Sequence, residues 1–174
     1  MRITRGTGGE IGYNGRMERR SGFTLIELMI VLGIIVIISV VTAVSLFSVR
    51  NTRDLTNTAN EIGTLLREAQ SRAVNQDGGA SWGVRMDNTT AGAPFYALFS
   101  GTYSTNSRTG VYPLPPDVQF DSSTVPSGGA LEITFTELTG IPSAATSVVL
   151  DLMTNGAPSA STTISVNTAG LITY

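Results

Sequence analysis

Histidine, cysteine and lysine are all absent from this 174-residue sequence, so its eleven positive side chains are all arginines. Without histidine, no imidazole can act as a general base near neutral pH. Without cysteine there are no thiolate nucleophiles, thiolate metal ligands or disulfides, and without lysine there is no Schiff base. Any metal would need oxygen ligands, which favours calcium or magnesium. We therefore predict a protein that is not an enzyme and that holds no cofactor or metal.

Charge is scarce and unevenly distributed along the chain. Charged residues make up 14% of the sequence, against about 25% in an ordinary soluble domain. Residues 1–22 hold five arginines and two glutamates, a net charge of +3 (5 − 2). In residues 23–49 the only charge is Glu27, and residues 28–49 form an uncharged, largely apolar run. As a helix this run is about 33 Å long, which matches the ~30 Å hydrocarbon core of a bilayer. We predict a transmembrane helix over residues 23–49.

The next segment, residues 50–76, keeps the helical period but becomes amphipathic. No proline interrupts residues 23–76, so one helix can continue from the membrane into solvent. Residues 77–79, Asp-Gly-Gly, are a typical helix stop. Small and apolar residues recur in steps of three and four on one predicted face: Leu55, Ala59, Ile62, Leu66, Ala69 and Ala73.

Residues 77–174 form a β-rich region that we expect to be exported. The last turn signal, at residues 168–170, predicts a terminal hairpin between residues 162–167 and 171–174. Segments 88–94 and 103–110 are rich in Gly, Thr, Ser and Asn and are expected to be loops. A long helix followed by strands predicts an α+β fold. Alternating or apolar patterns predict strands at residues 82–86, 95–99, 118–120, 131–135, 148–152 and 164–166.

The junction between the basic segment and the apolar run is distinctive. Ser21-Gly22 is followed by Phe23-Thr24-Leu25-Ile26-Glu27-Leu28, which resembles the class III leader junction of type IV pilins and pseudopilins. The resemblance implies that a prepilin peptidase cuts after Gly22 on the cytoplasmic side and methylates Phe23. Basic residues lie just upstream, as that leader requires: Arg16, Arg19 and Arg20. The alternative is an uncleaved anchor whose arginines keep the N-terminus in the cytoplasm. An ordinary signal peptide would have a shorter apolar core and a small-residue cleavage site.

Glu27 is the one acid of the apolar segment. A carboxylate within a span costs roughly 2.5–3.5 kcal/mol on insertion scales, and such residues are usually functional or paired. One interpretation is that lipid headgroups solvate it near the cytoplasmic edge of the membrane. The resemblance implies a role in subunit assembly, in which Glu27 pairs with the free α-amine of the first residue, Phe23, of a neighbouring subunit.

A second resemblance concerns the β-rich region. Segments 132–142 and 163–172 are similar to the GspH/FimT-like group of minor pseudopilins and minor type IV pilins. This implies a pilin-like α+β fold in which the second half of the helix packs on an antiparallel sheet. It further implies a structural subunit of a type II secretion pseudopilus or a type IV pilus. That subunit would be a single-pass inner-membrane protein with a cytoplasmic N-terminus and a periplasmic or extracellular C-terminal domain. Its partners would be the prepilin peptidase, other pilin or pseudopilin subunits, the inner-membrane assembly platform and membrane lipid.

The alternative function is that of a FimT-like minor pilin whose exported domain binds DNA or another ligand at the pilus tip. From residue 23 onward there are six arginines and eleven acids, a net charge of −5 (6 − 11), and no arginine follows Arg108. Because phosphate binding needs local positive charge, nucleic acid is disfavoured, although Arg85 and Arg108 could meet in space. The acids after residue 116 are isolated rather than grouped in a calcium loop, which favours a minor over a major subunit.

Overall fold

The computed structural model describes residues 22–89 and 93–174, and in residues 41–49 it describes the backbone alone. The leader arginines Arg16, Arg19 and Arg20 lie outside the described residues. The chain forms two compact units, Met1–Thr42 and Ala43–Tyr174.

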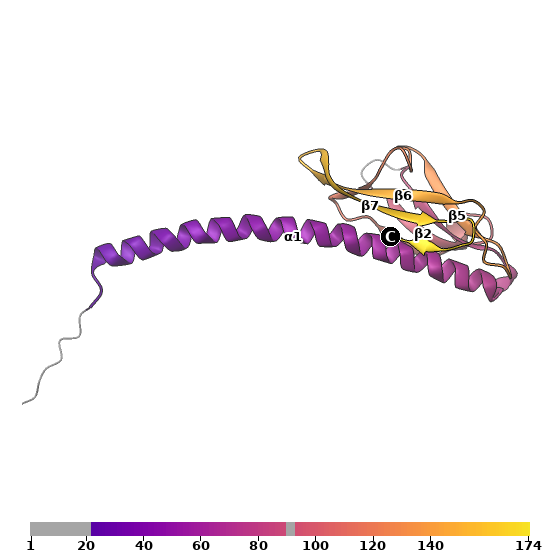
Figure 1. Ribbon diagram of the computed structural model, residues 1–174, viewed down its shortest axis with the longest axis horizontal. Coiled ribbons are helices and arrows are strands. Elements are labelled where there is room, and N and C mark those ends of the chain that lie inside the picture. The colour runs from indigo at the N-terminus through magenta and orange to yellow at the C-terminus, as the bar shows by residue number, and fades with distance from the viewer. Residues whose placement is uncertain (1–21, 90–92) are drawn as a thin grey trace, which may run out of the picture. The chain divides into compact units, whose positions relative to one another are not determined.

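The long helix α1 runs from Leu25 to Val74 (Figure 1). It begins after Thr24, whose side-chain hydroxyl accepts a hydrogen bond from the backbone N–H of Glu27 at 3.3 Å. It ends before Gln76, which takes a left-handed conformation with φ 55° and leads into the short 3₁₀ helix η1 (Asp77–Gly79). The predicted uninterrupted helix and its Asp-Gly-Gly stop are therefore confirmed.

The rest of the second unit contains two antiparallel four-stranded sheets. The strands are β1 (Trp82–Asp87), β2 (Phe95–Ser100), β3 (Arg108–Pro113), β4 (Val118–Phe120), β5 (Ala130–Phe135), β6 (Thr146–Thr154), β7 (Ala157–Val166) and β8 (Ile172–Thr173). A short 3₁₀ helix, η2 (Thr105–Ser107), precedes β3. In sheet A the strand order is β3-β2-β1-β5, and in sheet B it is β4-β6-β7-β8.

All six predicted strands and the terminal hairpin are confirmed. The backbone N–H of Asn167 donates to the carbonyl of Leu171 at 3.1 Å and closes the hairpin between β7 and β8. The expected loop over residues 103–110 is wrong at its end, because β3 begins at Arg108 and pairs with residues 95–99 of β2. This strand lies at the edge of sheet A and is only half-buried at alternate residues, so it has no apolar alternation to reveal it.

The hydrophobic core joins the second half of α1 to both sheets. The inner faces of the sheets contribute Val84 and Ile133 from sheet A and Leu150 and Ile164 from sheet B, each at most 1% exposed. This arrangement confirms the α+β class, with two sheets in place of the single sheet expected. All six residues of the predicted helical stripe are buried, with at most 4% of their surface exposed: Leu55, Ala59, Ile62, Leu66, Ala69 and Ala73.

Polar contacts hold the chain's last residues on α1. The side-chain amide of Gln70 donates to the carbonyls of Gly140 and Gly170, at 3.0 and 3.1 Å. Arg67 donates to the hydroxyl of Tyr174 at 2.6 Å. The Tyr174 ring lies so close to α1 that a Cβ added at Gly63 would be 2.3 Å from its Cε1 atom. The absence of a side chain at Gly63 therefore leaves the space that the Tyr174 ring occupies against α1.

Candidate processing and assembly segment

The predicted cleavage site, Gly22–Phe23, lies just before α1. Residues 22–24 have no regular secondary structure and are exposed, and 83% of the Phe23 surface is accessible. A Cβ added at Gly22 would meet no atom within 4 Å. The bond is therefore in a segment that a protease can reach without unwinding the helix.

Thr24 also belongs to this segment, although the sequence analysis did not single it out. Its side-chain oxygen accepts from the N–H of Glu27, and its carbonyl accepts from the N–H of Leu28 at 3.2 Å, so Thr24 is the N-cap of α1. Thr-x-x-Glu is the spacing of a capping box, a signal that was readable in the sequence. The cap fixes where the helix begins and places Glu27 in its first turn.

Glu27 is exposed, and within the described residues no side chain bonds to its carboxylate. A negative charge in the first helical turn is stabilised by the helix dipole, typically by 0.3–1 kcal/mol. That gain is smaller than the insertion cost of roughly 2.5–3.5 kcal/mol. The helix dipole therefore offsets only part of the free-energy cost of placing the Glu27 carboxylate in a membrane span. The pairing of Glu27 with a neighbouring subunit stays a prediction.

The first part of α1 presents apolar side chains around its whole circumference. Between Leu25 and Val40 the large hydrophobic residues are between 46% and 76% exposed. A surface of this size and character is typical of a segment that is covered by lipid or by other subunits.

Across the part of the chain that the structure describes, no helix is both long enough and apolar enough to cross a membrane. The predicted span over residues 23–49 extends into residues 41–49, whose side chains lie outside the described part. It stays a prediction.

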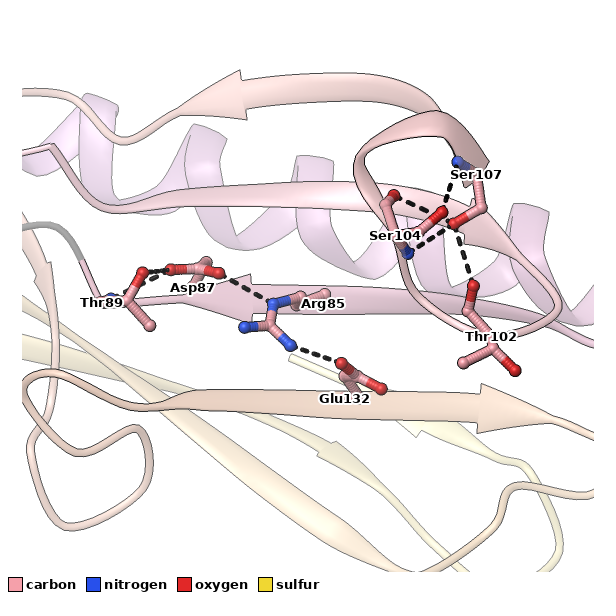
Figure 2. A network of polar contacts seen from close by, with 7 residues as sticks. All are labelled: Arg85, Asp87, Thr89, Thr102, Ser104, Ser107 and Glu132. Atoms are coloured by element: carbon pink, nitrogen blue, oxygen red, sulfur yellow. Dashed lines mark hydrogen bonds and ion pairs between the residues drawn. The ribbon is translucent and has the colours of Figure 1, made fainter.

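In the β-rich domain, Arg85 and Arg108 converge on one aromatic ring. The two guanidinium groups lie over the ring of Tyr103, with their carbons 4.2 and 5.1 Å from its centroid. Arg85 is also ion-paired with Asp87 at 2.8 Å and with Glu132 at 2.5 Å, as Figure 2 shows. Two carboxylates thus balance the charge of Arg85, which makes this cluster a poor phosphate site.

Asp87 is buried at the centre of this network and also accepts from the backbone and hydroxyl of Thr89 (Figure 2). Burial alone would raise the pKa of Asp87, but the hydrogen bonds from Thr89 and Arg85 outweigh it and hold the pKa below its usual range. Asp87 consequently stays charged at neutral pH, and Arg85 links β1 to β5 through its ion pair with Glu132. In residues 22–89 and 93–174, no group of three acidic side chains is placed to hold a metal ion.

Residues 17–45 match a protein-family model, the prokaryotic N-terminal methylation motif. The chain carries this motif. The match covers Gly22, Phe23 and Glu27 together and confirms the resemblance of the leader junction, while the roles of the single residues stay predictions. No match is found among curated proteins.

Two solved structures are similar to this chain. One is the type IV minor pilin FimU of Pseudomonas aeruginosa, with 20% identity, a TM-score of 0.48, and coverage of 73% of this chain and 90% of that chain. The other is the minor pseudopilin EpsH from the type 2 secretion system of Vibrio cholerae, with 13% identity and a TM-score of 0.44. That likeness covers 69% of this chain and 94% of the pseudopilin.

Proposed function

We propose that this protein is a minor pilin or pseudopilin, a structural subunit of a type II secretion pseudopilus or a type IV pilus. The observation that carries the proposal is the methylation motif at residues 17–45, placed at the start of a capped helix with an acid in its first turn. The absence of histidine, cysteine and lysine agrees with a structural rather than a catalytic role.

Processing is the first step of the proposed function. A prepilin peptidase cuts between Gly22 and Phe23 and methylates the new N-terminal residue. The exposed, irregular backbone of residues 22–24 supports this step. The basic leader is removed in the cytoplasm, and residues 23–49 anchor the mature chain in the inner membrane, with the domain from residue 50 onward outside the cytoplasm.

Assembly is the second step. Apolar side chains between Leu25 and Val40 exchange lipid for the helices of neighbouring subunits on the assembly platform. In that bundle Glu27 accepts the positive α-amine of Phe23 from the next subunit. An ion pair in an apolar bundle is stable only when both partners are present, because an unpaired buried charge costs about 3–5 kcal/mol.

The test uses the full chain, expressed with its assembly machinery, and compares Glu27→Gln with Asp54→Asn. Asp54 is also an exposed acid on α1, so the second variant controls for loss of one negative charge. We expect Glu27→Gln to insert and be processed but to enter filaments at about one tenth of the normal level or less. Asp54→Asn should assemble normally. Equal incorporation of both variants would contradict the assembly role of Glu27.

A further inference from the structure

The arginines of the described chain fall into two groups. Six arginines occur from residue 22 onward. Four of them contact other groups of the exported domain through hydrogen bonds, ion pairs or stacking on aromatic rings: Arg67, Arg72, Arg85 and Arg108. Arginine is therefore used in this domain mainly to hold the domain's own structure together.

Arg50 and Arg53 are the exception. Both are exposed on α1, and among the described residues neither has a hydrogen bond, an ion pair or a ring contact. Their spacing of three residues places them on one side of the helix, where two like charges repel each other. No described carboxylate pairs with either guanidinium group, although Asp54 stands at the i+4 position from Arg50, so both cations are open to an anion from outside the chain.

The distance of this pair from Glu27 along α1 indicates which anion could reach it. Arg50 is the first charged residue after Glu27, 23 residues further along α1. At 1.5 Å per residue this separation is about 34 Å, close to the ~30 Å hydrocarbon thickness of a bilayer. A straight membrane-spanning helix of this length with Glu27 near one interface would bring the two guanidinium groups level with the headgroups of the opposite leaflet.

We propose that Arg50 and Arg53 bind the phosphate groups of anionic phospholipids in the outer leaflet of the inner membrane. This inference rests on the proposed function, because it needs residues 23–49 to span the bilayer. A planar guanidinium binds phosphate oxygens in a bidentate manner. Each arginine near an anionic surface strengthens the association about fivefold, and the contacts break when the subunit leaves the membrane for the filament.

An acidic side chain of a neighbouring subunit is the competing partner for these arginines. Asp54, immediately next to Arg53, is the one acid close to the pair in sequence, and it stands on the same helix as the pair. The experiment below separates lipid from protein.

The measurement is the lipid preference of the full chain in vesicles. Because the sequence has no cysteine, Asn57→Cys provides a single exposed site for a donor fluorophore close to the pair. The vesicles are phosphatidylcholine with a trace of acceptor-labelled phosphatidylglycerol or acceptor-labelled phosphatidylcholine. We expect energy transfer to show severalfold enrichment of phosphatidylglycerol. Arg50→Gln with Arg53→Gln should bring the preference close to one, whereas the corresponding double lysine variant should retain most of it.

Arg108→Gln is the control for loss of positive charge elsewhere and should leave the preference unchanged. An equal transfer to both lipids in the wild-type chain would overturn the inference, as would a preference that survives the double glutamine change. Loss of the preference in free inorganic phosphate, but not in sodium chloride of equal ionic strength, would indicate a phosphate-ion site instead. If the double glutamine variant keeps its lipid preference but fails to enter filaments, the arginines face another subunit.

A separate measurement distinguishes failure of the proposed membrane anchor from failure of the proposed lipid binding. Alkaline carbonate releases a chain that does not span the membrane, and such release would contradict the anchor itself. An integral chain without lipid preference would contradict the role of Arg50 and Arg53 alone.

Discussion

The two halves of α1 differ in whether their apolar side chains are buried. Between residues 50 and 74 the helix has one apolar stripe, and the chain's own sheets bury it. Between Leu25 and Val40 the large apolar side chains are all exposed, by 46% to 76%. The second half is therefore stabilised within the chain, whereas the first half needs an apolar environment from outside. The same secondary structure is buried along one face in the second half and exposed around its circumference in the first half.

The largest effect should come from a change that acts on the first half alone. Gly22→Leu should block removal of the leader almost completely, because the resemblance implies that the peptidase accepts glycine before the cut. A Cβ at residue 22 meets no atom of the described residues within 4 Å, so thermal unfolding of the β-rich domain should not change. Intact-mass spectrometry measures the processing. Normal cleavage of this variant would argue against the leader assignment.

A matched pair of truncations tests the contrast between the halves directly. Leu66→Ala removes a side chain that is 0% exposed and should lower the free energy of unfolding by about 2–5 kcal/mol. Ile34→Ala, at a position 52% exposed, should change it by less than about 0.5 kcal/mol. Denaturant unfolding of the full chain in detergent, followed by Trp82 fluorescence, gives both values. Similar losses would mean that the first half also packs on the chain itself.

Filling the space between Gly63 of α1 and the Tyr174 ring should lower the free energy of unfolding by an intermediate amount. Gly63→Ala places a Cβ 2.3 Å from the Tyr174 ring and should cost about 1–3 kcal/mol through displacement of that ring. Combining it with Tyr174→Ala should recover part of the loss, because the clash is then absent. Additive losses in this double-mutant cycle would show that the two residues do not meet.

An effect of similar size concerns acid stability. The depressed pKa of Asp87 means that the stabilisation by this group is complete at neutral pH. It is lost as the pH falls from about 4 through the folded-state pKa. Asp87→Asn should destabilise the domain at pH 7 by about 1–3 kcal/mol and flatten the acid limb of the stability curve. Unfolding measured at several pH values checks both effects, and an unchanged acid limb would exclude Asp87 as its source.

Local periodicity made much of this structure predictable. The stripe from Leu55 to Ala73 and the stop at residues 77–79 follow from spacing and turn chemistry alone. The division into two sheets does not, since it depends on pairings such as Trp82 with Phe135 across 53 residues (135 − 82). β3 was missed because an edge strand needs no apolar alternation. The convergence of Arg85 and Arg108 on Tyr103 likewise depends on long-range register.

The site was predictable to a similar degree. Gly22, Phe23 and Glu27 stand at fixed spacings, so a local motif was sufficient to select them. The cap at Thr24 was also local, in the Thr-x-x-Glu spacing, but the resemblance drew attention to Glu27 alone. That Arg50 and Arg53 are unpaired required the structure, because only the structure shows which arginines the fold already uses.

The most direct test of the account is the mass of the mature N-terminus. The native protein, purified from membranes and analysed intact and by N-terminal fragmentation, should begin at Phe23 and carry one added methyl group on its α-amine. A protein that still carries Met1–Gly22, or that begins at an unmethylated residue other than Phe23, would contradict the central claim.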